Sequence, residues 1–546
     1  MSESKANRKP KNLTAGKFFW ALLVHFLMFL RIAFDWFVDF VISFKFDDSQ
    51  SVKIPPPKEK FLMESASSLA SKIRKKEITA EEVVKATINR IKEVNPILNA
   101  VVDDQFEEAI KEAQEVDAFL RTTSLSEEQI KEQKPFLGVP FTNKESTMAK
   151  GQSFSLGLVS RKGIKGTEDA AVTTKYKNSG AILVATTNVP ELNLWTETRN
   201  NNFGMTVNPY NTNRTVGGSS GGEGCMIASC GSFIGLGTDI GGSLRMPAYF
   251  CGIFAHKPTT GLISTKGLGF RKEIPDRTMV CAGPMVRFAE DLAPVTKILY
   301  HHEIEKFAAE AKLMQVDKEV AMKDIKFYYI EDPLDPRVSP VSSDVKSVIR
   351  KAVDFLSEAS GRPAVKLQIP EFRYSFTLWR YWMTKEIRNG EKFAKMLGNR
   401  EKTVSAPVEL MNLIFGRCEY TLPAILKIID DEYLPSVPPK WAEETTKKLK
   451  DELLEILGDD GVLIFPSNPH PPGLHYSAFL RPYNFAYWAI INVLEFPATQ
   501  VPMGLTKKGL PVGFQVVSKK YNDHFTISVA KALEKQFGGY VPPFSS

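Results

Sequence analysis

The strongest chemical signal in this 546-residue chain lies between Gly217 and Arg245. This stretch begins Gly-Gly-Ser-Ser-Gly-Gly-Glu and ends Gly-Thr-Asp-Ile-Gly-Gly-Ser-Leu-Arg. Glycine at this density lets the backbone approach a ligand closely and adopt positive φ angles. Serines lie in both of its glycine-rich ends, Ser219-Ser220 in the first and Ser243 in the second. A serine hydroxyl is a poor nucleophile without a neighbouring base, so the stretch predicts a catalytic site only if a base accompanies it.

Two residue types can supply that base. Histidine is the usual one, but none of the seven histidines lies within residues 217–245. The nearest, His256, is expected to be structural, although a distant histidine can still be adjacent in space. Lysine becomes a base when burial lowers its pKa. Lys144 ends the apolar run that starts at Pro135, so the end of a buried strand can hold it facing inward; a surface lysine is the ordinary alternative.

The segment Ile240-Gly241-Gly242-Ser243 has a second use. Successive small residues expose backbone N–H groups that can hold a developing oxyanion, and one such donor contributes about 3 kcal/mol of transition-state stabilisation. We expect the flanking Asp239 and Arg245 to form a structural ion pair with this loop. Ser220 is a candidate hydrogen-bond partner for the amine of Lys144.

The glycine-rich stretch has three other interpretations. Residues 217–221 fit G-x-S-x-G, the nucleophile elbow of α/β-hydrolases, but that motif needs an apolar strand before it. Residues 208–214 have the composition of a loop instead. A phosphate cradle lacks the following G-K-[ST] and a completed G-x-G-x-x-G. A purely structural loop is the simplest alternative for an isolated Gly/Ser run.

Taken together, the two ends of the stretch and the lysine run resemble the amidase signature family, whose hydrolases cleave amides with a Ser-Ser-Lys triad. Residues 509–515, Gly-Leu-Pro-Val-Gly-Phe-Gln, resemble it as well. The resemblance extends from about Phe61 to the C-terminus. It implies an α/β fold with a central twisted mixed sheet surrounded by helices, and no metal or organic cofactor.

Position by position, the resemblance assigns three roles. Ser243 matches the nucleophile, Ser219 the serine that relays the proton, and Lys144 the base. It also implies a cis peptide bond between Gly218 and Ser219.

The N-terminal part predicts attachment to a membrane. We divide the chain into a basic tail (1–17), an anchor (18–46), a proline-marked linker (47–60) and an amidase catalytic domain (61–546). Within the anchor, three charged residues, Arg31, Asp35 and Asp39, are spaced four apart on one helix face, where they can pair. The segment is interpreted as a single helix that spans or lies deep in the interface; an amphipathic helix on the bilayer surface is the alternative.

The anchor also predicts on which side of the membrane the catalytic domain lies. The basic tail favours a cytosolic N-terminus, so a spanning anchor would place the catalytic domain in the lumen of the endoplasmic reticulum. A cleaved signal peptide is disfavoured because the apolar stretch is long and lacks an A-x-A site. Asn213-Arg214-Thr215 is a glycosylation sequon, and we do not expect it to be used because it lies beside the glycine-rich stretch.

The periodicity predicts alternating helices and strands, typical of an α/β domain. Helices are expected from the capping box at Thr79 to about Val94 and over 103–121, and strands over 136–141, 181–187, 325–330, 461–465 and within 499–517. The aromatic segment 374–383 is expected to pack in the core, and shaping the substrate site is the alternative. Residues 410–429 are expected to form a broken helical hairpin, either core packing or a membrane-docking cap.

Composition excludes some functions. The net charge is only +7, without a compact basic stripe, so no nucleic-acid partner is expected. The five cysteines form no C-x-x-C pair, so neither a zinc site nor a disulfide framework is indicated, and Cys225, Cys230 and Cys251 are expected to be buried packing residues.

With the anchor, the resemblance implies a membrane-bound serine hydrolase of long-chain fatty-acid amides, and a homodimer is left open. The alternatives are an amidase of short or aryl amides, the amidase subunit of a tRNA-dependent amidotransferase, and a non-catalytic membrane-tethered binding protein.

Overall fold

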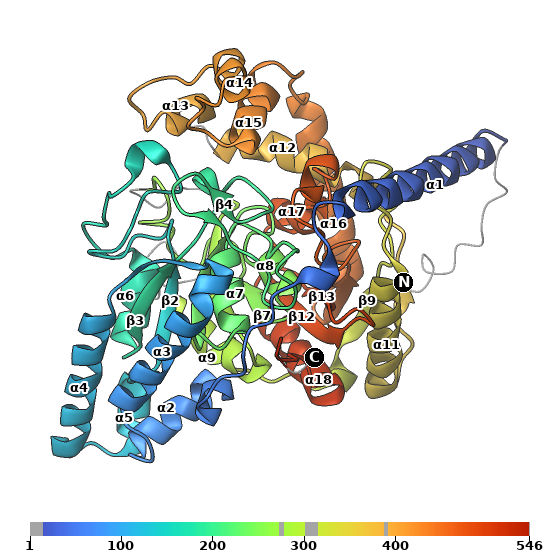
Figure 1. The fold of residues 1–546 in the computed structure, drawn as a ribbon. Coiled ribbons are helices and arrows are strands. Elements are labelled where there is room, and N and C mark those ends of the chain that lie inside the picture. Colours follow the sequence, from blue (N-terminus) through green and yellow to red (C-terminus); the bar gives the residue numbers. More distant parts are fainter. Residues whose placement is uncertain (1–14, 272–277, 301–314, 387–390, 545–546) are drawn as a thin grey trace.

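The computed structural model describes residues 15–271, 278–300, 315–386 and 391–544, so most of the predicted basic tail lies outside the described residues. Its centre is one long sheet (Figure 1). In the described part of the chain this sheet has eleven strands, in the spatial order β1 (Val101–Asp104), β3 (Ile182–Thr187), β2 (Pro140–Lys144), β6 (Ile234–Asp239), β8 (Cys281–Val286), β7 (Phe254–Lys257), β12 (Ala498–Leu505), β13 (Pro511–Val517), β11 (Gly461–Phe465), β9 (Lys326–Tyr329) and β10 (Val365–Lys366). A separate small ribbon pairs β4 (Arg199–Asn200) with β5 (Gly204–Met205).

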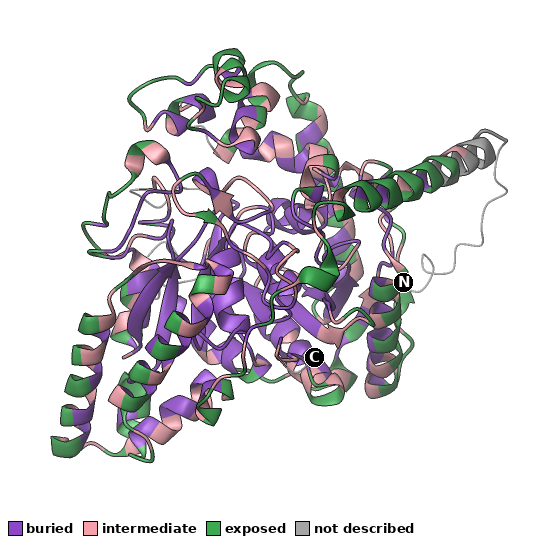
Figure 2. Ribbon diagram, viewed as in Figure 1, coloured by how far each residue is buried: buried purple, intermediate pink, exposed green. Residues whose placement is uncertain are grey.

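The sheet is mixed, as predicted. Strand β2 runs parallel to both β3 and β6, whereas the strands from β6 to β11 pair antiparallel. The register places Phe141 opposite Ile234 and Asn143 opposite Leu236, which brings the end of β2 beside the glycine-rich stretch that follows β6. The central strands are buried throughout (Figure 2), as expected for a sheet covered on both faces.

Helices surround this sheet (Figure 1). They are α1 (Ala15–Ser43), α2 (Ala66–Arg74), α3 (Ala80–Leu98), α4 (Phe106–Thr122), α5 (Glu127–Gln133), α6 (Ala171–Asn178), α7 (Gly221–Ala228), α8 (Arg245–Phe250), α9 (Leu292–Leu299), α11 (Ser343–Ser360), α12 (Ser375–Glu386), α13 (Phe393–Leu397), α14 (Ala406–Ile414), α15 (Leu422–Glu432), α16 (Pro439–Leu457), α17 (Ala486–Leu494) and α18 (Asp523–Phe537).

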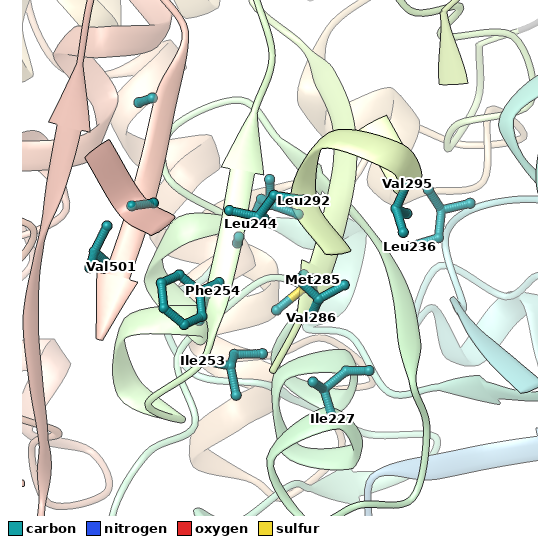
Figure 3. Packing of buried hydrophobic residues seen from close by; sticks show 14 of the residues in the cluster. Ile227, Leu236, Leu244, Ile253, Phe254, Met285, Val286, Leu292, Val295 and Val501 are labelled. Atoms are coloured by element: carbon teal, nitrogen blue, oxygen red, sulfur yellow. The ribbon is translucent and has the colours of Figure 1, made fainter. Parts of the chain in front are cut away.

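The main core lies between the central strands and the helices that cover them (Figure 3). Leu236 of β6, Phe254 of β7 and Met285 of β8 meet Ile227 of α7 and Leu292 of α9 there, all essentially without exposed surface. Burying a side chain of this size contributes about 1.5–3 kcal/mol each. This packing fixes β6 and α7, the two elements that carry the ends of the glycine-rich stretch.

Several predicted elements form with shifted ends. The strand predicted over 136–141 begins only at Pro140, because Gly138 has a φ of 79° and a turn precedes it. The helix predicted over 103–121 loses its first residues to β1 and starts at Phe106. Strand β11 matches its prediction residue for residue, and the Thr79 hydroxyl caps α3 by accepting the N–H of Glu82.

The predicted hairpin over 410–429 corresponds to α14 and α15, which gather with α13 at one end of the molecule (top of Figure 1). Ile425 and Ile428 of α15 are completely buried in a second hydrophobic cluster. Ile414 and Phe415, by contrast, are 75% and 65% exposed. The hairpin therefore combines a small core of its own with an outward apolar face.

Helix α1 contains most of the predicted anchor. Within the described residues, no helix is long and apolar enough to cross a membrane, so the spanning anchor has no support. The charged stripe packs on the catalytic domain, with Asp35 buried and Asp39 partly open to solvent. The Arg481 guanidinium donates to Asp35 Oδ1 at 2.9 Å and to Asp39 Oδ1 at 2.7 Å. The predicted pairing of Arg31 with Asp35 is present at 3.4 Å.

The predicted linker also lies against the catalytic domain. Asp48 pairs with Arg214, and the Val52 N–H donates to the Thr212 hydroxyl at 2.9 Å. The Asn213 side-chain amide donates to the carbonyl oxygen of Asp47, so the sequon asparagine is engaged by the linker.

Candidate active site

Lys144 is the last residue of β2, and its side chain is completely buried. Its Nζ donates to Ser219 Oγ at 2.7 Å and to Thr238 Oγ1 at 2.8 Å. Burial lowers the pKa of Lys144 to about 7, although the nearby carboxylates of Asp239 and Glu223 raise it in part. The predicted buried lysine with a depressed pKa is therefore present, and a substantial fraction of it is neutral at pH 7.

Ser219 and Ser220 directly precede helix α7. The Gly218–Ser219 peptide bond is cis, as the resemblance implies. A Cβ atom on Gly218 would collide with the carbonyl oxygen of Trp195, so only glycine fits there. The Ser220 hydroxyl bonds the backbone of Thr238 rather than the amine of Lys144, so its predicted contact is wrong. The hydroxyl of Thr238 accepts from the amine instead.

Ser243 lies just before α8 and is half-buried, more accessible than Ser219. Its carbonyl oxygen accepts the N–H of Ser220 at 3.1 Å, which fixes its backbone beside the Ser219–Ser220 turn. In the described part of the chain the Ser243 hydroxyl makes no hydrogen bond of its own. The structure thus brings Lys144 and Ser219 into direct contact and places Ser243 next to them with a free hydroxyl.

The N–H groups expected to hold an oxyanion fall into two sets. Gly242 donates to Asp239 Oδ1 at 2.8 Å and is already occupied. Among the hydrogen bonds of the described residues, none uses the N–H of Ile240, Gly241 or Ser243. The predicted donor set therefore narrows to these three residues.

Two tryptophans hold this loop in place. Trp379 of α12 donates its Nε1–H to the Ile240 carbonyl at 2.9 Å. Gly242 has a φ of 111°, and a Cβ atom there would lie 2.5 Å from the Cβ of Trp488. The loop is thereby fixed by contacts with two helices, which suits a preorganised set of N–H donors.

Asp239 and Arg245 form the predicted structural ion pair. Both are fully buried, and the guanidinium contacts the carboxylate at 2.9 Å and 3.1 Å. Burial alone would raise the pKa of Asp239, but the charge and hydrogen bonds of Arg245 lower it to about 2. Arg245 also donates to Gln515 Oε1 at 2.6 Å and to Asn492 Oδ1 at 2.7 Å, so the C-terminal Gly509–Gln515 stretch supports the loop from behind.

The histidine nearest in sequence plays no part in this cluster. The ring of His256 contacts Thr499 Oγ1 at 2.9 Å and Asp523 Oδ1 at 3.1 Å, inside the core between β7 and α18. Its predicted structural role is confirmed. Cys225, Cys230 and Cys251 are buried, as predicted.

Three residues of the site were not singled out by the sequence. Thr238 becomes the second partner of Lys144 only because β6 lies beside β2. Trp379 and Trp488 come from distant helices, and nothing in their local pattern differs from ordinary core aromatics. A strand prediction for residues 234–239 would have identified Thr238.

Known proteins resemble this chain along most of its length. The family model described as "Amidase" matches residues 82–527. The chain is 40% identical over 494 residues to fatty-acid amide hydrolase 2 of Homo sapiens, covering 89% of this chain and 92% of the relative. It is 27% identical over 489 residues to a component of the glutamyl-tRNA(Gln) amidotransferase of Clostridium botulinum, covering 87% and 98%.

A solved structure named "Fatty acid amide hydrolase" superimposes with a TM-score of 0.68 at 22% identity, covering 90% of this chain and 87% of that one. The shared fold is the α/β fold expected from the sequence, a large mixed sheet surrounded by helices. The chain therefore belongs to the amidase signature family and is a hydrolase that cleaves amides.

Proposed function

We propose that this chain is a membrane-bound serine hydrolase that cleaves long-chain fatty-acid amides to a free fatty acid and an amine. Ser243 is the nucleophile, Ser219 relays protons and Lys144 is the base. The observation that carries the proposal is the fully buried Lys144 with its Nζ 2.7 Å from Ser219 Oγ, next to the free hydroxyl of Ser243.

In the acylation step protons move between Ser243, Ser219 and Lys144, first toward the lysine and then away from it. Neutral Lys144 takes the proton of Ser219 as Ser219 takes that of Ser243, and the Ser243 oxygen attacks the amide carbonyl. The N–H groups of Ile240, Gly241 and Ser243 hold the resulting oxyanion. Lysine then returns the proton through Ser219 to the departing nitrogen, the C–N bond breaks, and an acyl ester of Ser243 remains.

Deacylation repeats the sequence with water. A water molecule attacks the ester carbonyl while its proton passes to Lys144, and the tetrahedral intermediate collapses to release the fatty acid. The proton returns to the Ser243 oxygen, which restores the starting state. Apart from this water, each step uses only side chains and backbone groups of this chain.

The lipid part of the proposal rests on the relatives and on two exposed apolar surfaces. The first is the outward face of α1 with the residue that follows it, where large apolar side chains are exposed at Phe26, Phe29, Leu30, Ile32, Phe34, Trp36, Phe37, Phe40, Val41 and Phe44. The second is the outer face of α14 and its following turn, at Val408, Met411, Leu413, Ile414 and Phe415. Exposed apolar surface of this extent is typical of membrane or partner contacts.

Membrane attachment through α1 is therefore proposed in its interfacial form. The charged stripe faces the catalytic domain and the apolar side faces outward, which suits a helix lying in the headgroup region. A lumenal catalytic domain depends on a helix that crosses the bilayer, for which the described residues give no support.

A substrate screen tests the function. Amides with one leaving group and acyl chains from short to long, together with an aryl amide, should show kcat/KM rising with chain length. Labelling by a fluorophosphonate probe separates a serine hydrolase from a non-catalytic binding protein. A preference for the short or aryl amide would overturn the lipid assignment and leave the amidase assignment standing.

A further inference from the structure

A buried carboxylate that the proposed chemistry does not use lies close to Lys144. Glu223 is the third residue of α7, and its side chain has no exposed surface. Its Oε1 accepts the hydroxyl of Thr187 at 2.6 Å, and its Oε2 accepts the hydroxyl of Thr142 at 2.8 Å. No ion pair among the described residues includes it. Burial of a carboxylate without a cation is unfavourable, and ionisable groups in such surroundings cluster at functional sites.

The two threonines place this carboxylate beside the stem of the lysine. Thr142 and Lys144 are two residues apart on β2, so their side chains point to the same face of the sheet, about 7 Å apart. Thr187 lies opposite Lys144 in the register of the parallel strands β2 and β3. Because Glu223 binds both threonines, its carboxylate lies on the face of the sheet from which the Lys144 side chain projects.

Two glycines let the first turn of α7 come this close to the strands. A Cβ atom on Gly235 of β6 would lie 2.4 Å from Glu223 Oε2, and one on Gly222 would lie 2.8 Å from the Cβ of Thr187. The backbone N–H of Leu236 is a further donor to the carboxylate. The carboxylate is therefore held by groups from β2, β3 and β6, and the positive end of the helix dipole also favours an anion there.

Two carboxylates act on the charge of Lys144, and they differ in their partners. Asp239 and Glu223 both raise the pKa of Lys144 against the effect of burial. Asp239 is paired with the fully buried Arg245, whose positive charge opposes that of the carboxylate at the lysine. The donors to Glu223 that the structure describes are all neutral. Glu223 is thus the neighbouring carboxylate whose charge no partner offsets.

The other ionisable groups nearby do not take this role. Burial raises the pKa of Tyr176 of α6, which also faces Glu223, well above its usual range, so its phenol stays neutral. Lys257 bonds the Pro258 carbonyl and lies on the Asp239 side. Glu145 follows Lys144 directly in the chain, but its carboxylate accepts the hydroxyl of Ser155 and binds the turn over residues 153–156.

We propose that Glu223 is a positioning residue for Lys144. Its hydrogen bonds with Thr142 and Thr187 tie α7 to the two strands beside the amine, and its charge stabilises the protonated amine midway through the reaction. The inference rests on the proposed function for the role of Lys144 as the base.

The physical reason lies in the two states that Lys144 must adopt. It must be neutral to accept a proton and protonated to return that proton to the departing nitrogen. Burial disfavours the protonated state, and a nearby carboxylate offsets part of that effect. Burial also raises the pKa of Glu223 to about 7, against the hydrogen bonds from Thr187 and Thr142, so its charge is present above that pH.

The test removes the charge and keeps the shape. In Glu223→Gln a threonine hydroxyl can accept from the new amide, so the hydrogen bonds can be kept. Glu145→Gln is the matched control, because it neutralises an equally buried carboxylate that follows Lys144 in the chain. Full-length proteins are compared by kcat/KM for a short soluble amide between about pH 5 and 9. Circular dichroism and thermal unfolding report whether each variant is folded.

Glu223→Gln should move the midpoint of the pH profile down by at least about 0.5 pH unit, because the protonated amine loses its unpaired counter-charge. The plateau at high pH should fall by about three- to tenfold, since an amine with a lower pKa is a weaker base. In Glu145→Gln the midpoint should stay within about 0.2 pH unit of wild type, whatever happens to its stability.

A second variant leaves Glu223 itself in place. Thr187→Val keeps the shape of the side chain and removes one donor to the carboxylate, which makes its charged form less favourable. The midpoint should move in the same direction as in Glu223→Gln but less far. If Glu223→Gln does not fold, an unchanged midpoint in folded Thr187→Val overturns the inference.

A second readout separates this inference from the proposed function. The rate at which acetic anhydride acetylates Lys144, followed by mass spectrometry over the same pH range, reports the protonation of the amine without assuming that it is the base. If Glu223→Gln shifts the acetylation midpoint but not that of kcat/KM, Glu223 acts on Lys144 and the proposed role of Lys144 fails. If neither midpoint moves while wild type remains active, the inference is wrong and the hydrolase stands. Equal shifts in Glu223→Gln and Glu145→Gln would also overturn it.

Discussion

The serine cluster and helix α1 use buried charge in opposite ways. At the cluster, Asp239 and Arg245 are both fully buried and hold the Ile240–Ser243 loop in place from behind. On α1, the buried charges of Asp35 and Arg481 attach an element whose other face is apolar and exposed. In the first region the buried polar groups fix the loop to which we assign the oxyanion donors. On α1 the polar groups form the contact with the catalytic domain, and the apolar side chains therefore face outward.

This contrast explains why hydropathy misjudged α1. Its apolar residues and its charged stripe suggested a helix that crosses the bilayer or pairs its charges along its own length. Arg31 and Asp35 do pair along the helix at 3.4 Å, but Asp35 and Asp39 also bind Arg481, which lies 446 positions beyond Asp35 in the chain. An apolar helix with a polar stripe can therefore be a docked element with one free face.

The largest expected effect tests the chemistry of the cluster. Ser243→Ala should lower amide turnover by roughly 10⁴–10⁶-fold, because the covalent route is lost while the donor loop remains. Fluorophosphonate labelling of this variant should disappear. Labelling that persists and maps to another serine would break the assignment of Ser243.

The next effect concerns the buried lysine. Lys144→Ala should lower amide turnover by roughly 10²–10⁴-fold, since the proton relay loses its base. A matched ester should lose less, because an alkoxide leaves without needing the same protonation. Equal losses on amide and ester would argue against Lys144 as the proton donor to the leaving group.

Lys257 offers a control for that variant. It is a second fully buried lysine whose pKa is lowered by burial, but it bonds the Pro258 carbonyl and Thr260 rather than the serines. Lys257→Met should keep turnover per folded molecule within about tenfold of wild type. A loss of turnover as large as that of Lys144→Ala would show that the effect is not specific to the lysine that contacts Ser219.

The pH profile gives a smaller but sharper test of the cluster. Only neutral Lys144 can accept a proton, and its pKa is about 7. The neutral fraction grows as pH rises, so kcat/KM for an amide should increase between about pH 6 and 8 and then level off. A flat profile across that range would contradict a base with this pKa.

The features that could be predicted from the sequence are mostly those set by a few neighbouring residues. The strand Gly461–Phe465 and the burial of Lys144 follow from short apolar runs, and the glycine-rich ends mark the tight turns around Ser219 and Ser243. The roles of Thr238 and Trp379 could not be predicted in this way. Each depends on which strand or helix lies beside the loop, and that neighbour is set by the whole sheet order.

The contacts that hold α1 and the α14–α15 hairpin in place were the hardest features to predict from the sequence. Arg481 lies just beyond a short 3-10 helix over Ser477–Leu480, with no local sign that it faces α1. Likewise, local pattern does not distinguish buried Ile425 from exposed Ile414, because both lie in apolar helical runs. Contacts between segments far apart in the sequence determine both the partner of Arg481 and the burial of Ile425.

The docking of α1 can be tested directly. Arg481→Met leaves Asp35 buried without its main partner, and removing one member of a buried pair typically costs about 3–5 kcal/mol. Helix α1 should then detach, so limited proteolysis within residues 47–60 should quicken by at least about tenfold.

A substitution at Asp39 should have a smaller effect than Arg481→Met. Its side chain is 56% exposed, against 7% for Asp35. An exposed pair contributes about 1 kcal/mol or less, so Asp39→Asn should quicken the cleavage by less than about fivefold. Equal effects of Arg481→Met and Asp39→Asn would show that burial of Asp35 is not what holds the helix.

The smallest effect is expected at the α14–α15 hairpin, the second apolar surface. In the full chain α1 supplies most of the outward apolar area, so Ile414→Glu should weaken liposome binding by only about three- to tenfold, the loss of one apolar side chain's burial. Ile425→Glu is a different perturbation, because Ile425 is completely buried in the hairpin's own core and its charge would unfold the hairpin rather than repel a bilayer. Circular dichroism and thermal unfolding distinguish the two variants. If Ile414→Glu binds liposomes as well as wild type while remaining folded, the outer face of this hairpin does not contact the membrane, and α1 alone carries the attachment.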